Sequence, residues 1–240
     1  MARYSPWTDS QRLALGSWLE KEYYADYSTY WPSTSQFGAE RGFPTWAPPA
    51  TPSAGLPEEP WEIQVVNSKT SRAYEALRHD SMVAELVAFD AEWVPDFKGS
   101  NHPISVLQFA FPSSCKVYVV QLARVGNLPA EVQMMLVNPR VMKVGFGVDF
   151  KDTEKLATTG ISVYQDSIFD VQHSCAHLLG FARPGLRRAA QELLGYALKK
   201  DRRCCLSDWS ASELSMEQVE YAALDAWVTL RLFYLDGYFW

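Results

Sequence analysis

The sequence predicts an α/β domain in which a mixed central β-sheet is flanked by α-helices. Three observations carry this prediction. Apolar runs of strand length follow one another closely between residues 85 and 122, strand-like and helix-like segments alternate after that, and a helical segment of 20 residues occupies 216–235. Consecutive strands followed by strand–helix units are typical of a mixed sheet with helices packed against it.

The individual elements follow from periodicity and residue type. Strands are expected where β-branched and aromatic residues concentrate, at 62–67, 85–94, 104–111, 116–122 and 141–148. Helices are expected where apolar residues recur at helical spacing, at 71–80, 129–138, 152–160, 169–180, 186–195 and 216–235. The last helix follows Ser215 and carries Gln218 three residues later, which is the spacing of a capping box.

The first 60 residues differ in composition from the rest. They are rich in Pro, Ser, Thr and aromatic residues, with a short helix expected at 9–24 and a proline-rich linker at 44–60. The expected organisation is therefore an N-terminal extension, residues 1–60, followed by one domain, residues 61–240. The extension contains too many aromatic residues for a simple disordered tail, so it either packs on the domain, binds a protein partner or lies on the surface.

Composition limits the functional classes. The 240 residues are 48% hydrophobic and carry a net charge of −6, with an isoelectric point near 5.3. This charge argues against a basic protein that coats nucleic acid, but not against a nuclease that holds phosphate through metal ions. With neither a secretion signal at the N-terminus nor an apolar run approaching ~18 residues, the protein is expected to be intracellular, nuclear or cytoplasmic, with reduced cysteines and no membrane association.

Two acidic residues occupy an otherwise apolar strand. Asp90 and Glu92 are two residues apart in the run VAFDAEW, so their side chains project from the same face of the sheet. Burying two unpaired carboxylates is costly, whereas a hard divalent cation such as Mg²⁺ removes that cost. Taken alone, such a pair is more often a solvated strand position than a metal site.

Further acids and a tyrosine follow later in the chain. Asp149 and Asp152 come after a strand that ends in a glycine-containing turn, and either could simply cap the next helix. Tyr221 and Asp225 lie four residues apart, on one face of the final helix, among small alanine residues that permit close approach to a sheet.

Together these segments resemble the DEDD superfamily of 3′→5′ exonucleases, in its tyrosine-containing subgroup. The resemblance covers about residues 62–236 and is carried by the FDAEW strand, the glycine turn before DTEKL, the stretch LSDWS and the helical motif YAALDA. It implies a ribonuclease H-like fold. Glu220 stands where the histidine subgroup would have its histidine, and His173 and His177 lack the context of a metal motif.

The resemblance also implies the roles of the site residues. It assigns the metal ligands to Asp90, Glu92, Asp152 and Asp225 and the catalytic tyrosine to Tyr221. One extra residue after Gly145 leaves Asp149 as a competitor, and Asp152 is preferred because DTEKL matches better. The implied cofactors are two Mg²⁺ or Mn²⁺ ions, and the implied substrate is RNA or DNA with a free 3′ end, from which phosphodiester hydrolysis releases nucleoside 5′-monophosphates.

Three residues near the acidic strand are candidates for substrate binding. Gln108 occupies the family's second-strand position, and Trp93 and Phe109 could stack on terminal bases. For both aromatic residues the alternative is a place in the sheet core.

Two other functions remain open at this point. The chain could be a catalytically silent nucleic-acid-binding or adaptor module on the same fold, although such a module has no use for the carboxylates. It could also be an interaction subunit whose working part is the aromatic N-terminal segment.

Overall fold

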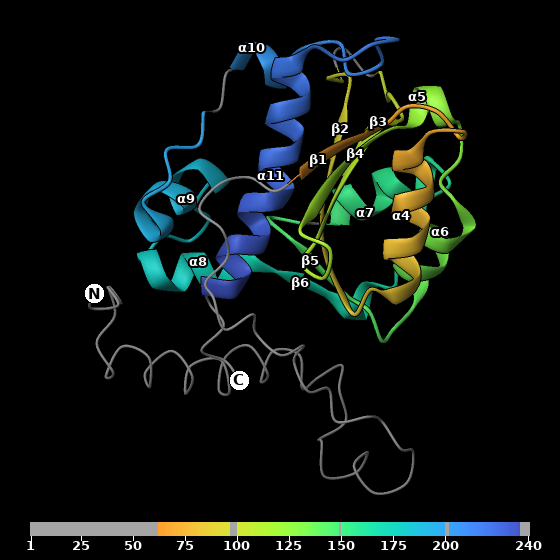
Figure 1. Ribbon diagram of the computed structural model, residues 1–240. Coiled ribbons are helices and arrows are strands. Elements are labelled where there is room, and N and C mark those ends of the chain that lie inside the picture. Colours follow the sequence, from red (N-terminus) through yellow and green to blue (C-terminus); the bar gives the residue numbers. More distant parts are fainter. Residues whose placement is uncertain (1–61, 97–99, 149, 200–201, 236–240) are drawn as a thin grey trace, which may run out of the picture. The chain divides into compact units, whose positions relative to one another are not determined.

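The computed structural model describes residues 62–96, 100–148, 150–199 and 202–235. The expected helix at 9–24 and linker at 44–60 lie outside these residues. The described chain is built around a sheet of six strands with helices on both faces, as Figure 1 shows. Within these residues, no helix combines the length and apolar character needed to cross a membrane.

The sheet is mixed, as the sequence predicts. Its strands are β1 (Glu62–Val66), β2 (Leu86–Trp93), β3 (Ile104–Phe111), β4 (Lys116–Gln121), β5 (Met142–Gly145) and β6 (Ile168–Asp170). They are arranged in the order β1-β4-β3-β2-β5-β6. The pairs β2–β3 and β3–β4 are antiparallel, and the other neighbours are parallel. The strand that carries the two acids therefore lies inside the sheet, between β3 and β5.

The helices divide between the two faces of the sheet. The longest helix, α11 (Met216–Leu235), crosses one face and contacts β2, β3, β4 and β5. On the same side are α8 (Val171–Leu179) and α9 (Leu186–Leu194), which contact α11, and the short α10 (Arg202–Cys205). The opposite face bears α4 (Arg72–Val83), α6 (Ala130–Val137) and α7 (Phe150–Thr158); the short α5 (Leu122–Val125) follows β4.

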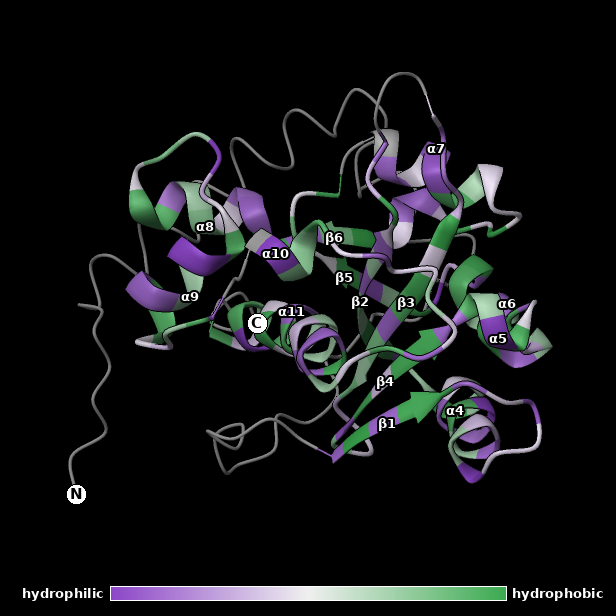
Figure 2. Ribbon diagram, turned by 90° about the horizontal axis from the view of Figure 1, so that it is seen from above, coloured by the Kyte–Doolittle hydropathy of each residue, from purple (hydrophilic) through white to green (hydrophobic). Residues whose placement is uncertain are grey.

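The main hydrophobic core fills the space between the sheet and α4, α6 and α7. It contains Leu77 of α4, Leu136 of α6 and Leu156 of α7, packed against Phe89 and Phe109 of the sheet. Figure 2, viewed from above, shows the predominantly hydrophobic strands between the two helical layers. Because Phe89 packs into this core, the side chains of β2 that alternate with it face away from the core.

The strands and the longer helices agree broadly with the predicted ones, but the strand predicted at 141–148 ends at Gly145, and the short helices α5 and α10 were not predicted. The segment 169–180 was predicted to be one helix, but Ile168–Asp170 form edge strand β6 and the helix begins at Val171. Asp170 causes the break, because its side chain accepts a hydrogen bond from the backbone N–H of Gln172 and so caps α8. The third helix of the core face, α7, begins at Phe150, two residues before the predicted start.

Candidate active site

The two acids of β2 point away from the hydrophobic core. Phe89, Ala91 and Trp93 belong to the core or pack against it. Because side chains alternate along a strand, Asp90 and Glu92 occupy the other face, over which α11 runs. Both side chains are only partly buried, whereas the apolar residues in the first half of β2 are buried. The sequence-predicted carboxylate pair is therefore placed together, between the sheet and α11.

The backbone is irregular where these acids lie. The β2–β3 register runs regularly from Ala88 to Glu92 and then shifts, so that Trp93 pairs with Ile104 and Ser105 is the extra residue. One carboxylate oxygen of Asp90 accepts a hydrogen bond from the N–H of Ala91 at 2.9 Å. Bulges of this kind redirect side chains and are common beside active sites.

The capping box predicted at the start of α11 is present. The Ser215 hydroxyl accepts a hydrogen bond from Gln218 N at 3.2 Å, and Gln218 Oε1 accepts one from Ser215 N at 2.9 Å. This fixes the first turn of the helix, and one turn later the ring of Tyr221 is buried. Asp225 follows on the same face and is only 2% exposed, so α11 presents a buried carboxylate toward the sheet.

Electrostatics place Tyr221 next to acids from both elements. The pKa of the Tyr221 hydroxyl is raised far above its usual value, first by burial and then by the negative charges of Asp225 and Glu92. A hydrogen bond with Cys205 acts in the same direction. Glu92 from β2 and Asp225 from α11 therefore both face the phenol, which stays protonated throughout the neutral range. The structure brings together these three predicted residues.

The loop before α11 holds this tyrosine in place. Gln218 donates through Nε2 to the Ser207 hydroxyl at 2.9 Å and to the Asp208 carbonyl at 3.1 Å. The next residue, Trp209, is fully buried, and its ring lies 5.9 Å from that of Tyr221, centroid to centroid. The stretch LSDWS is thus tied to the first turn of α11 and packs its tryptophan against the tyrosine ring. Cys205 was not predicted from the sequence as a site residue, and no sequence motif marks it.

Gln108 lies beside Asp90 on β3. The two residues are register partners across the antiparallel pair, so their side chains project from the same face. Gln108 is fully buried, and neither its Nε2 nor its Oε1 has a hydrogen-bond partner within the described residues. A buried amide with both ends unsatisfied is costly. Its position next to an acid indicates a polar site in which a further group would complete the hydrogen bonds.

Asp152 lies in the first turn of α7, after the turn that follows β5. Gly147 in that turn has φ +71°, in the left-handed region that favours glycine. Its N–H donates to Asp170 Oδ1 at 2.7 Å, which ties the turn to the end of β6. Burial raises the pKa of Asp170, although this N–H and that of Gln172 act in the opposite direction. Asp149, the competitor of Asp152, lies outside the described residues.

The two aromatic candidates are placed differently from Gln108. Phe109 is fully buried in the hydrophobic core, on the face opposite Asp90, and its ring cannot stack on a base unless the core opens. Trp93 also packs against the core, with Lys155 Nζ 5.3 Å from its ring centroid. Lys155 is itself held by Asp96 at 2.7 Å. For both aromatic residues the structure favours the core interpretation.

The donor set suits a hard divalent cation in its chemistry, because Asp90, Glu92 and Asp225 are carboxylates on facing elements and Gln108 adds a buried amide. Among the described residues, however, no three His, Cys, Asp or Glu side chains are grouped closely enough to hold an ion as they stand. An ion would therefore draw these carboxylates together or complete its shell with water and substrate oxygens.

The sheet order, with β3 antiparallel to the other five strands and the acid-bearing β2 beside it, and the crossing C-terminal helix define a protein of the ribonuclease H-like fold. Comparison with known families specifies it further: the chain belongs to the 3′-5′ exonuclease family, whose model matches residues 65–234. This match covers nearly the whole region in which the sequence resembles the DEDD superfamily.

Curated relatives share the domain but are much longer. The chain is 28% identical over 177 residues to "Exonuclease 3'-5' domain-containing protein 2" of Drosophila melanogaster, a match that covers 71% of this chain and 29% of that protein. It is 27% identical over 151 residues to the mouse "Bifunctional 3'-5' exonuclease/ATP-dependent helicase WRN", covering 62% and 11% of the two chains. The chain thus corresponds to less than a third of either relative.

Solved structures share the fold. The exonuclease domain of Nibbler from Aedes aegypti superimposes with a TM-score of 0.61 at 24% identity, covering 73% of this chain and 87% of that one. Ribonuclease D of Trypanosoma brucei, in complex with RNA U12, gives 0.61 at 18% identity, with coverages of 72% and 61%. NrnC of Brucella melitensis, with bound Mg²⁺, gives 0.56 at 23% identity, with coverages of 73% and 80%.

Proposed function

We propose that this chain is a metal-dependent 3′→5′ exonuclease that hydrolyses the terminal phosphodiester bond of RNA or DNA and releases nucleoside 5′-monophosphates. One observation carries the proposal beyond family membership. Glu92 of β2 and Asp225 of α11 both act on the Tyr221 hydroxyl, so two acids 133 positions apart in sequence converge on one phenol. The activity is assigned to residues 61–240, with residues 1–60 as an extension able to bind a protein partner.

Four carboxylates are proposed to hold two divalent ions, Mg²⁺ or Mn²⁺. Asp90 and Glu92 reach the site from β2, Asp225 from α11 and Asp152 from the start of α7. When bound, such ions supply an acidified water and neutralise charge on the phosphate and on the departing 3′ oxygen. Asp90 would hold an ion from β2, the strand that pairs with β5 through Leu86, Val87 and Ala88.

Tyr221 is proposed to orient the attacking water. Its raised pKa keeps the hydroxyl protonated at neutral pH, so it acts as a hydrogen-bonding group and not as a base. The ring is fixed by Trp209 and by the capped first turn of α11, which leaves the hydroxyl little freedom. A group held in this way contributes by positioning, at no reorganisation cost during the reaction.

Gln108 is proposed to bind on the substrate side of Asp90. Its unsatisfied amide can donate to a phosphate or carboxylate oxygen and accept from a water. The backbone and phosphates of RNA and DNA offer the same partners, so this contact is compatible with either nucleic acid. The ribonuclease D and NrnC structures, solved with RNA and with Mg²⁺ respectively, support a nucleic-acid substrate and a divalent cofactor for this fold.

A silent nucleic-acid-binding module is the second candidate. The net charge of −6 favours it mildly, because an acidic protein needs compensation to approach phosphate. The clustering of acids at Tyr221 argues against it, since a module without chemistry gains nothing from buried carboxylates.

Replacing Asp90 separates the two candidates. The Asp90→Ala protein should lose turnover of a labelled single-stranded oligonucleotide while its circular dichroism spectrum stays unchanged. Its melting temperature should stay the same or rise, because removing one acid relieves repulsion in the ion-free state. The matched control is Asp166→Ala, which removes an exposed acid just before β6 and should keep full activity. Full activity of the Asp90→Ala protein would contradict the assignment, and a collapsed fold would make Asp90 a structural residue.

A further inference from the structure

Positive charge is concentrated in one segment of this acidic chain. Residues 183–203 contain seven of the 22 Lys and Arg residues and only two acids, Glu192 and Asp201. The segment therefore carries +5 within a chain of −6, which leaves −11 for all the other residues. Such segregation of charge is the electrostatic pattern of an anion-binding surface.

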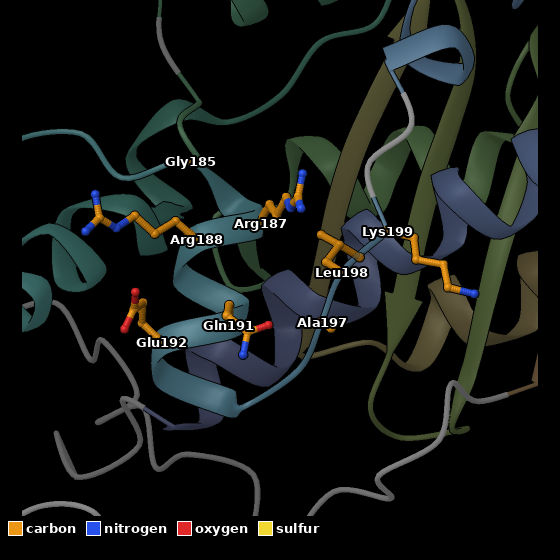
Figure 3. A pocket seen from close by; sticks show the side chains of 8 residues that line it. All are labelled: Gly185, Arg187, Arg188, Gln191, Glu192, Ala197, Leu198 and Lys199. Carbon is orange, nitrogen blue, oxygen red and sulfur yellow. The ribbon is translucent and has the colours of Figure 1, made fainter.

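The described part of this segment forms a pocket. It has a volume of about 490 Å³ and lies between α9 and the chain that returns from it, lined by Arg187, Arg188, Gln191 and Glu192 of the helix and by Ala197, Leu198 and Lys199. Figure 3 shows the Arg187 side chain on the side of α9 nearer Leu198. The Arg188 and Glu192 side chains lie on the opposite side of α9 and point away from Leu198.

The three cations of this pocket differ in their contacts with the rest of the protein. The Arg188 guanidinium lies 3.6 Å from the ring centroid of Phe181, so it packs on the residue that follows the C-cap of α8. Arg187 and Lys199 are exposed and make no ion pair with another described residue. Exposed cations without a counter-charge next to a hollow are available to bind an anion. The buried Leu198 anchors the returning chain between them.

The segment continues to the candidate active site. Six residues after Lys199 comes Cys205, whose carbonyl accepts a hydrogen bond from Trp209 Nε1 at 3.4 Å. Trp209 in turn packs on the ring of Tyr221. Six residues span at most about 20 Å, and a stacked strand carries one phosphate per ~3.4 Å. The pocket is therefore within about six phosphates of Tyr221.

We propose that the pocket formed by Arg187, Arg188 and Lys199 is a phosphate-binding subsite that holds the single-stranded nucleic acid upstream of the scissile bond. The proposal rests on the proposed exonuclease function. It adds a substrate-length requirement: a strand of about six nucleotides is long enough to place an upstream phosphate in the subsite, whereas a dinucleotide has none to place there because its single phosphodiester is the scissile one. Arg187 and Lys199 bind by charge, while Phe181 beneath Arg188 adds an exposed aromatic surface on which a base can stack.

Charge reversal of the subsite tests this proposal. Arg187→Glu and Lys199→Glu are compared with Arg140→Glu, an exposed cation before β5 and outside this segment, which changes the net charge equally. Hydrolysis of 12-nucleotide oligouridylate and oligothymidylate should show a KM raised about tenfold in the first two variants with kcat unchanged, and no change in the control. Hydrolysis of a dinucleotide should be unaffected in all three.

Binding measured separately distinguishes failure of the subsite from failure of the exonuclease assignment. Anisotropy of the same fluorescent 12-nucleotide strands, without divalent ions, should show weaker binding for Arg187→Glu and a salt slope reduced by about 0.7. This result does not depend on cleavage. The subsite is refuted if both reversed variants bind like Arg140→Glu, if dinucleotide hydrolysis falls as much as that of the 12-nucleotide strand, or if a polyglutamate peptide displaces the strands equally well at equal charge.

Discussion

The most informative single substitution is Tyr221→Phe. It removes one oxygen atom and keeps the ring, which is buried and packed 5.9 Å from the Trp209 ring. It removes the side-chain hydrogen bond with Cys205 and keeps the ring contact with Trp209. Loss of one such bond costs about 1 kcal/mol or less. The melting temperature should therefore change little.

The catalytic effect should be far larger. A group that orients the attacking water typically contributes a factor of about 10²–10⁴ in rate. Because this contact is made mainly in the transition state, the loss should appear in kcat and not in KM. The raised pKa of Tyr221 has a further consequence: the hydroxyl is protonated near neutral pH, so the wild-type rate should show no tyrosine ionisation in the neutral range.

Tyr118→Phe provides a matched control in the same chain. The Tyr118 hydroxyl donates to Asp80 Oδ2 at 2.7 Å in a buried pair between β4 and α4, in the core on the face of the sheet opposite α11. Removing this bond to a charged acceptor should lower the free energy of unfolding by roughly 1.5–3 kcal/mol and leave kcat unchanged. Steady-state kinetics and thermal melts of both variants test the pair. A Tyr221→Phe enzyme with full kcat would show that Tyr221 is a packing residue.

Three further substitutions have distinct expected outcomes. Gln108→Leu removes two unsatisfied buried atoms, so it should raise stability by about 1–3 kcal/mol while lowering kcat/KM; a variant with unchanged kinetics would remove Gln108 from the site. Lys143 is fully buried, and burial lowers its pKa from 10.5 to about 8. Since the unfolded chain holds that proton more tightly, wild-type stability should rise between pH 8 and 10.5, and Lys143→Met should abolish this slope and stabilise the fold at pH 7 by roughly 1–3 kcal/mol. A variant that melts with the wild-type pH dependence would contradict this. Asp152→Asn should lower the rate by several orders of magnitude and Asp149→Asn only slightly; the reverse result would move the third ligand to Asp149.

The sequence was sufficient for the elements that carry strong local patterns. Alternation in VAFDAEW predicted both the strand and the shared face of Asp90 and Glu92, and the structure confirms the placement of that strand in a mixed sheet. The 20-residue helix and its capping box were equally readable, since both depend on residues close in sequence. The ribonuclease H-like fold and the exonuclease family follow from these motifs taken in order.

Features that depend on contacts between distant residues could not be read in the same way. Strand β6 has only three residues, and its pairing with β5 and the cap from Asp170 outweigh the helical appearance of the segment. The approach of Cys205 to Tyr221 depends on how the LSDWS loop folds back on α11. For Phe109, composition alone left base stacking and core packing open, and the alternation relative to Asp90 places it in the core.

The central claim is tested most directly by the polarity and metal dependence of cleavage. The full chain is incubated with 5′-labelled single-stranded RNA, single-stranded DNA and recessed duplex, with Mg²⁺, with Mn²⁺ or with excess EDTA. The account predicts a ladder that shortens stepwise from the 3′ end, release of nucleoside 5′-monophosphates with either ion, and no cleavage in EDTA. Undiminished hydrolysis in EDTA, or cleavage that begins at internal positions or at the 5′ end, would contradict it.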